Sequence, residues 1–190
     1  MRRAASLPLL AVAGLLVAAC ASLPPGSSTM APIAVDAPFA LEGRLSARQG
    51  TQGFAAHFAW AHLPPRDELV VQTPLGQGIA ELDGDTSVPQ VVVRMADGRR
   101  DEARDWGELT ARTLGVALPV TWLAAWVRGA PHADAPHSAE VDAMARTSVL
   151  RQNGWEIVYA YADESTRLPS RLRLAYPDIE IAIVVDRWRH

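Results

Sequence analysis

Residues 39–60 read FALEGRLSARQGTQGFAAHFAW and contain two stretches in which apolar side chains recur at every second position. The first stretch begins at Phe39 and the second at Phe54. A period of two is typical of a strand that buries one face and exposes the other. Residues 49–53 lie between the stretches and contain two glycines, as a hairpin loop often does. This part of the chain therefore predicts an antiparallel β-hairpin with one buried face.

Further strands are expected on both sides of a helical middle section. Asp105 followed by Glu108 predicts the start of a helix that ends at Gly115, and a second helix is expected from Leu118 to Gly129. Residues 130–140 are expected to form a loop rich in alanine, proline and histidine. The other expected strands are 67–73, 78–82, 91–95, 146–152, 155–161, 171–176 and 179–188.

Two strand-rich parts separated by a short helical section predict a mainly β fold of the α+β class. The expected architecture is an antiparallel sheet curled around short helices, with one face in water and the other covered. Two helices cover only part of such a face, which leaves room for an apolar cavity between the helices and the sheet.

The first twenty residues are typical of a processing signal. Arg2 and Arg3 precede an apolar stretch, Leu7–Ala19, which is shorter than the roughly 20 residues of a membrane span. The stretch ends directly before Cys20, the only cysteine of the chain, and resembles a bacterial lipobox. We therefore expect a lipoprotein signal peptide over 1–19 and an acylated Cys20. The alternative is an ordinary signal peptide in which the cysteine occurs by chance.

The segment that follows the cysteine differs in composition from the rest of the chain. Residues 20–37 are rich in proline, serine and alanine, which favours a lipidated N-terminus followed by a flexible linker. A single domain is expected over 38–190. Acyl chains on Cys20 would anchor that domain to a membrane without spanning it.

Composition and motifs argue against several classes of function. The 190 residues include 18 arginines and 21 acidic residues, and no basic cluster indicates a nucleic-acid partner. The hydrolase, metalloprotease and nucleotide-binding motifs are absent from the sequence. The five histidines lack a convincing metal-ligand spacing. We therefore expect neither an enzyme nor a metal site, and no cofactor other than the lipid on Cys20.

Apolar residues provide the candidate binding sites. Trp122 and Trp126 lie four positions apart on the second expected helix, near Leu118. They suit either ordinary core packing or the lining of a lipid cavity. Leu75 stands between Pro74 and Gly76 in a tight link between two strands, where packing into a core is difficult. An exposed leucine of this kind on a membrane-anchored protein could enter the acyl layer.

An ordered set of motifs behind the lipobox resembles the LolB family of outer-membrane lipoprotein receptors. The resemblance extends from Phe39 to Trp188. Its carriers are FALEGRLS at 39–46, Trp60, TPLGQ at 73–77, Leu114-Gly115, Leu118-Pro119-Val120, Leu123, Trp126, Arg128-Gly129, Gln152, Gly154-Trp155, Tyr159, Leu168-Pro169, Asp186 and Trp188.

The resemblance implies an incomplete antiparallel β-barrel with a helical lid that encloses an apolar cavity. It also implies a receptor at the outer membrane, facing the periplasm, that takes acylated lipoproteins from a LolA-like periplasmic carrier and inserts them into that membrane. The family's membrane-inserting leucine falls on Leu75. The candidates for the acyl-chain cavity are Phe39, Leu41, Phe58, Trp60, Leu118, Trp122 and Trp126.

Three other interpretations remain open at this point. The chain could be a membrane-tethered binding module for another hydrophobic ligand, or a structural lipoprotein that scaffolds an outer-membrane complex. The third is a hydrolase, for which the sequence shows no nucleophile–base pair. A monomer is expected in each case.

Overall fold

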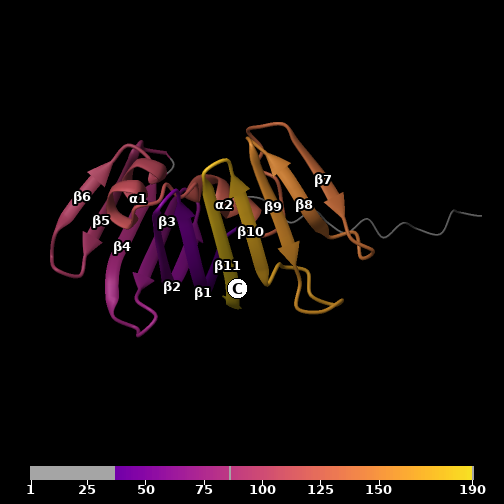
Figure 1. Cartoon of the computed structure of the whole chain (residues 1–190), viewed down its shortest axis with the longest axis horizontal. Coiled ribbons are helices and arrows are strands. Elements are labelled where there is room, and N and C mark those ends of the chain that lie inside the picture. The colour runs from indigo at the N-terminus through magenta and orange to yellow at the C-terminus, as the bar shows by residue number, and fades with distance from the viewer. Residues whose placement is uncertain (1–36, 86, 190) are drawn as a thin grey trace, which may run out of the picture. The chain divides into compact units, whose positions relative to one another are not determined.

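The computed structural model describes residues 37–85 and 87–189. In these residues, eleven strands form one antiparallel sheet and two short helices connect its halves (Figure 1). The strands are β1 (Phe39–Gln49), β2 (Gln52–Leu63), β3 (Arg66–Gln72), β4 (Gly78–Asp85), β5 (Gln90–Met95), β6 (Arg100–Ala103), β7 (His137–Val141), β8 (Thr147–Gln152), β9 (Trp155–Ala160), β10 (Arg171–Tyr176) and β11 (Ile179–Arg189). The helices are α1 (Trp106–Leu114) and α2 (Val120–Trp126).

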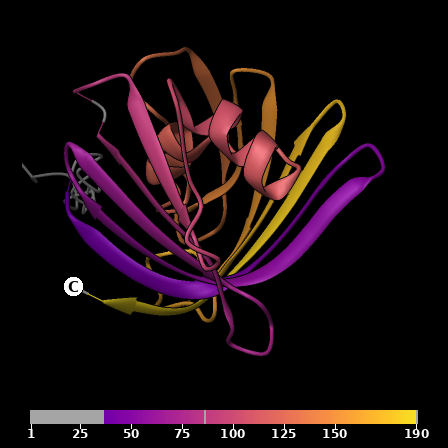
Figure 2. The ribbon, with the colours of Figure 1, turned by 90° about the vertical axis from the view of Figure 1, so that its left-hand side faces the viewer.

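The sheet consists of two meanders joined at their first and last strands. Strands β1 to β6 follow one another outward on one side, and β11 to β7 follow on the other. The sheet curves around the two helices (Figure 2). The edge strands β6 and β7 do not pair with each other in the described ranges, so the barrel is incomplete. The predicted fold class, a curved antiparallel sheet with short helices, is confirmed.

The pairing of β1 with β11 holds the two meanders together. The register runs from Ala40 opposite Arg189 to Gln49 opposite Ile179, with an irregularity after Glu42. Because the side-chain period of a strand is two, this register decides which residues of both strands face the core.

Neither of the two helices in the described residues has the length and apolar character of a membrane-spanning helix.

The alternation in β1 and β2 predicts the buried face correctly. Leu41, Leu45 and Ala47 are buried, whereas Arg44 and Arg48 on the opposite face are exposed. The buried face is the concave one, and the helices pack against it. The apolar side chains of α2 complete this core, because most of that helix is buried.

The start and end of α1 agree with the sequence pattern. The side chain of Asp105 accepts a hydrogen bond from the Glu108 backbone N–H at 2.8 Å, as an N-cap does. Gly115 has a φ of 79° and donates its N–H to the Ala111 carbonyl at 3.1 Å. This left-handed conformation is one that glycine adopts at low cost, and it ends the helix.

Two strands differ from the sequence-based prediction. Strand β7 begins at His137, inside the segment 130–140 that is expected to form a loop, and ends at Val141. Strand β6 lies in a charged segment for which no strand is expected. All five residues of β7 are exposed, and β6 consists of Arg-Asp-Glu-Ala. Neither edge strand carries an alternating apolar pattern, because neither buries a face.

Candidate functional site: an apolar cavity and an exposed leucine

A small apolar pocket lies between the helices and the concave face of the sheet. Its volume is about 30 Å³, which is enough for a water molecule and far too small for an acyl chain. The sheet contributes Leu45, Phe58, Trp60, Leu69, Val71, Leu82 and Ile183, and the helical section contributes Thr110, Leu114, Leu118, Val120 and Leu123. This lining is what an alkyl chain would require, since ligand sites are predominantly apolar.

Thr110 supplies the one polar side chain in the lining, and its hydroxyl is already satisfied by the backbone. It donates to the Trp106 carbonyl at 2.7 Å and accepts the Leu118 N–H at 2.8 Å. Thr110 belongs to α1, whereas Leu118 leads into α2. The hydroxyl therefore links the two helices and leaves no unsatisfied polar group facing the cavity.

The sequence-predicted cavity residues fall into two groups. Phe58, Trp60 and Leu118 line the cavity. Phe39 and Leu41 are buried elsewhere in the core and do not belong to the lining. Contact between any of these residues and an acyl chain stays a prediction.

The two tryptophans of α2 also lie outside the lining. Trp126 is fully buried and donates its Nε1–H to Oε1 of Gln152 at 2.8 Å. Its ring packs against Trp155, with centroids 5.9 Å apart. Trp122 is partly buried and lies with its ring centroid 4.7 Å from that of His132. Trp126 therefore fastens α2 to β8 and β9, and Trp122 packs against the loop that follows α2 at His132.

A buried polar cluster fixes the orientation of Trp60. Asp67 is 1% exposed, and its Oδ1 lies 2.7 Å from Trp60 Nε1, which donates to it, and 2.7 Å from His62 Nδ1. The His62 ring also stacks on Phe39, with centroids 4.9 Å apart. One carboxylate oxygen thus holds two aromatic rings, one of which lines the cavity.

Arg128 connects the end of α2 to the segment that enters β1. It is buried, and its Nε and one terminal nitrogen donate to the carbonyls of Ala124 at 3.2 Å and Ala37 at 2.8 Å. Its guanidinium also lies 5.1 Å from the Phe39 ring centroid. Sequence reasoning did not single out this role. The available signal was an arginine directly before the glycine at a helix end, where cations and left-handed residues are favoured.

Two tyrosines of the β9 region lie in low-dielectric surroundings. Burial raises the pKa of Tyr159 far above its usual value, and its hydroxyl has no hydrogen-bonding partner among the described residues. Burial also raises the pKa of Tyr161 to about 12, although the neighbouring Arg146 opposes the shift. Tyr161 donates its hydroxyl to the Thr147 carbonyl at 2.8 Å. Both phenols therefore stay neutral at physiological pH.

Leu75 occupies the tip of the β3–β4 loop and is 90% exposed. The turn around it is fixed by hydrogen bonds. The Gly76 N–H donates to the Thr73 carbonyl at 2.8 Å, and the Gln77 N–H donates to Thr73 Oγ1 at 3.1 Å. Pro74 at the second position and Gly76 with a φ of 82° suit such a turn. The leucine is therefore presented to solvent on a hydrogen-bonded turn.

Two predicted features lie outside the described residues. These are Cys20, with its acyl chains, and the signal peptide and linker over 1–37, apart from Ala37 itself. Among residues 37–85 and 87–189, no group of three or more His, Cys, Asp or Glu side chains is placed to hold a metal ion.

A curved antiparallel sheet that encloses an apolar cavity under two helices defines a domain suited to a hydrophobic ligand. Comparison with known proteins identifies the family. A family model described as "Outer membrane lipoprotein LolB" matches residues 37–188. The chain belongs to the LolB family, as its sequence motifs predict.

Individual relatives agree with this assignment. The outer-membrane lipoprotein LolB of Chromobacterium violaceum is 36% identical over 157 residues, which cover 82% of this chain and 83% of that protein. The protein of the same name from Azoarcus sp. is 36% identical over 185 residues, covering 95% and 93%. A crystal structure of a DUF1329 family protein from Desulfovibrio piger has a TM-score of 0.51 and 7% identity, covering 82% of this chain and 87% of that one, and shows a likeness of fold alone.

Proposed function

We propose that this chain is a lipid-anchored receptor of the outer membrane that accepts acylated lipoproteins from a LolA-like periplasmic carrier and inserts them into that membrane. The observation that carries the proposal is the apolar cavity beneath the helices in a chain of the LolB family. The relatives named above are outer-membrane lipoproteins by name, in keeping with an anchored receptor.

The transfer of acyl chains needs an apolar enclosure at every stage. Each CH₂ group exposed to water costs about 0.8 kcal/mol, so a lipoprotein cannot leave its carrier unless another apolar environment receives its chains. A receptor cavity that holds the chains more favourably than the carrier, and a bilayer that holds them more favourably still, suffice to give the transfer a direction. No energy source is required in this scheme.

The cavity of this structure must enlarge before it can hold an acyl chain. Its volume of about 30 Å³ is well below the roughly 300 Å³ at the lower end of ligand pockets. The sheet is fixed by its ladders, whereas α1 and α2 contact the cavity mainly through apolar side chains. Since Thr110 ties α1 to the residue that leads into α2, we infer that the two helices move together as a lid. The Trp126–Gln152 hydrogen bond, which fastens α2 to β8, must break when the lid leaves the sheet.

Two further residues have roles in this proposal. Acyl chains on Cys20 would keep the receptor at the membrane where its cargo is released, and the linker would give the domain reach. Leu75 would perturb the leaflet at the point of release. Its exposure and the hydrogen-bonded turn that carries it support this role, because an apolar side chain held away from the domain can reach the acyl boundary without exposing the core.

The proposal is tested by transfer in solution. The mature chain from residue 20, carrying Cys20→Ala so that no anchor contributes, is mixed with a periplasmic carrier preloaded with an acylated lipoprotein. We expect the lipoprotein to co-purify with the receptor, whereas a non-acylated form of the same protein should not. Absence of co-purification with a folded receptor and a competent carrier would reject the receptor function. Binding of free fatty acid without transfer would favour a module for another hydrophobic ligand.

The role of Leu75 is tested with vesicles added to the same mixture. Leu75→Glu should accept the lipoprotein as the parent chain does, but should deliver markedly less of it to the vesicles. Val88→Glu is the control, because Val88 is also an exposed apolar residue of a loop, between β4 and β5. Equal delivery by the Leu75 and Val88 variants would remove the proposed role of Leu75.

A further inference from the structure

Arg171 and Arg173 are two exposed cations to which the described residues offer no hydrogen-bonding or ionic partner. They lie two residues apart on β10, and the buried Leu172 and Leu174 between and after them place both arginines on the outer face of the sheet. Across the residues that the structure describes, neither guanidinium forms a hydrogen bond or ion pair. Positions i and i+2 of a strand are about 7 Å apart, so both side chains can approach one anionic group.

The neighbouring carboxylates of this face are already bound to other arginines. Asp186 accepts from Arg44 at 2.8 Å, and Glu180 accepts from Arg48 at 2.8 Å. Glu156 accepts from Arg151 at 2.8 Å. Arg171 and Arg173 therefore constitute a surplus of positive charge.

Four neighbouring strands of the sheet carry more arginines than carboxylates, although the chain as a whole is acidic. Strands β1, β9, β10 and β11 contain six arginines and four carboxylates, whereas the full sequence contains 18 arginines and 21 acidic residues. A local excess of one sign attracts partners of the opposite sign. The positive charge of this surface therefore attracts an anionic partner more strongly than the rest of the protein does.

Small side chains leave space beside Arg173. Ala182 lies directly opposite Arg173 on β11, and Ser46 lies opposite Ala182 on β1. Together with Ala175 they form the floor of a hollow of about 520 Å³ on the outer face. Glu156 and Glu180 line the same hollow, and each is paired with an arginine other than Arg173. A headgroup in the hollow would therefore reach the Arg173 guanidinium beside carboxylates whose charge is already balanced.

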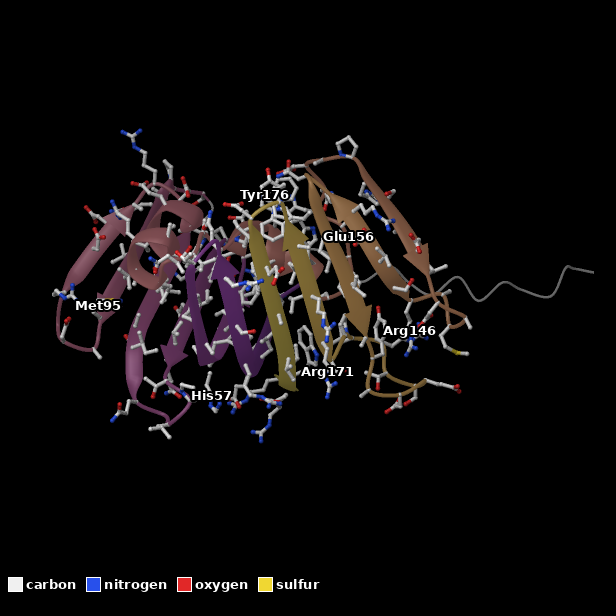
Figure 3. All side chains as sticks on the ribbon, in the orientation of Figure 1. His57, Met95, Arg146, Glu156, Arg171 and Tyr176 are labelled. Atoms are coloured by element: carbon white, nitrogen blue, oxygen red, sulfur yellow. The ribbon has the colours of Figure 1, made fainter. Side chains whose placement is uncertain are left out.

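The β3–β4 loop, which carries Leu75, lies on the same side of the molecule. Gln72 at the end of β3 is opposite His57, which is opposite Arg44, and the row continues through Val184 to Arg171. Arg171 is three strands from His57, or roughly 14 Å. The β3–β4 loop projects beyond the convex side of the sheet in Figure 2, and His57 and Arg171 both lie toward this side in Figure 3.

We propose that Arg171 and Arg173 bind the phosphates of anionic membrane lipids while Leu75 enters the leaflet, so that the outer face of the sheet docks on the membrane. This inference rests on the proposed function and adds the lipid chemistry and the orientation of the docked receptor. With the outer face on the membrane, the helices over the cavity remain accessible to a carrier on the opposite side.

The inference is tested by flotation of the mature Cys20→Ala chain with vesicles. Vesicles of phosphatidylethanolamine with phosphatidylglycerol are compared with vesicles of phosphatidylcholine alone. A basic residue near an anionic surface contributes about fivefold to binding, so each of Arg171→Ser and Arg173→Ser should weaken binding to the anionic vesicles about fivefold, and the double variant about twenty-fivefold. High salt should abolish the difference, because the charges are solvent-exposed.

Arg104→Ser provides the matched control. Arg104 is exposed, and its guanidinium also forms no ion pair within the described ranges, but it lies between β6 and the N-cap of α1, away from β10. Its replacement removes the same charge and should leave vesicle binding unchanged. Arg171→Lys with Arg173→Lys should retain most of the binding. If the double serine variant binds anionic vesicles as tightly as Arg104→Ser does, the docking surface is wrong.

The transfer assay without vesicles separates this inference from the proposed function. Normal acceptance of the lipoprotein by a double variant that no longer binds vesicles is the expected result. Normal acceptance with undiminished vesicle binding overturns the docking surface alone. Lost acceptance with undiminished vesicle binding would instead assign the arginines to an acidic surface of the carrier. If no variant accepts lipoprotein, the receptor function itself fails, whatever the vesicles show.

Discussion

Asp67 determines how the cavity-lining Trp60 is held. Its carboxylate is almost completely buried, and one oxygen is shared by Trp60 Nε1 and His62 Nδ1 at 2.7 Å each. Burying a carboxylate is costly unless donors surround it, and hydrogen bonds to a charged acceptor are about twice as strong as neutral ones. Asp67→Asn keeps the shape but introduces an amide NH₂ into the same site. We expect the free energy of unfolding to fall by about 1–3 kcal/mol in urea titrations. Glu68→Gln, one residue along β3 and exposed, should change it by less than about 0.5 kcal/mol. Equal stability of the two variants would show that the shared oxygen does not stabilise the fold.

At the level of elements, the first residue of α1 packs against β4 at a glycine. A Cβ atom added to Gly84 of β4 would lie 2.5 Å from Cζ2 of Trp106, the first residue of α1. Gly84→Ala must therefore displace the indole, and with it the start of the helix. We expect a loss of about 1–3 kcal/mol in the free energy of unfolding, together with a change in tryptophan fluorescence. Gly78→Ala on the same strand is the control, since nothing lies within 4 Å of its added Cβ. A Gly84 variant as stable as the Gly78 variant, with unchanged fluorescence, would contradict the direct packing of α1 on β4.

The elements also show what the sequence alone can predict. Strands that bury one face were identified by their alternation, and the Asn153-Gly154 turn between β8 and β9 has the positive φ values of 50° and 80° that such a pair favours. Edge strands β6 and β7 are not predictable from the sequence, because backbone hydrogen bonds hold them in the sheet and their side chains show no alternating apolar pattern. At the cavity, Trp60 could be proposed from its strand position. The prediction that Trp126 lines the cavity has no such basis. Periodicity identifies the apolar face of a helix, but it does not tell whether that face packs against β8 and β9, as Trp126 does, or faces the cavity.

For the whole molecule, the expected function divides the fold into a fixed part and a movable part. Pairing over ten positions makes β1 and β11 one rigid unit, whereas α1 and α2 have only nine and seven residues. Helices of this length are marginal in water and depend on packing for their order. If the helices open as a lid while the sheet persists, their amides exchange with solvent through a local opening, whereas the β1 and β11 amides exchange only on global unfolding. Native-state hydrogen exchange should therefore show at least about tenfold lower protection for buried amides of Val120–Trp126 than for those of Leu41–Ala47, a difference of about 1.4 kcal/mol. The amides of the exposed edge strand β7 serve as an internal reference, because they exchange by fraying of the sheet edge and do not depend on any movement of the helices. Protection of α2 equal to that of β1 would mean that the helices leave the sheet only when the domain unfolds, and acyl chains would then need another way into the cavity.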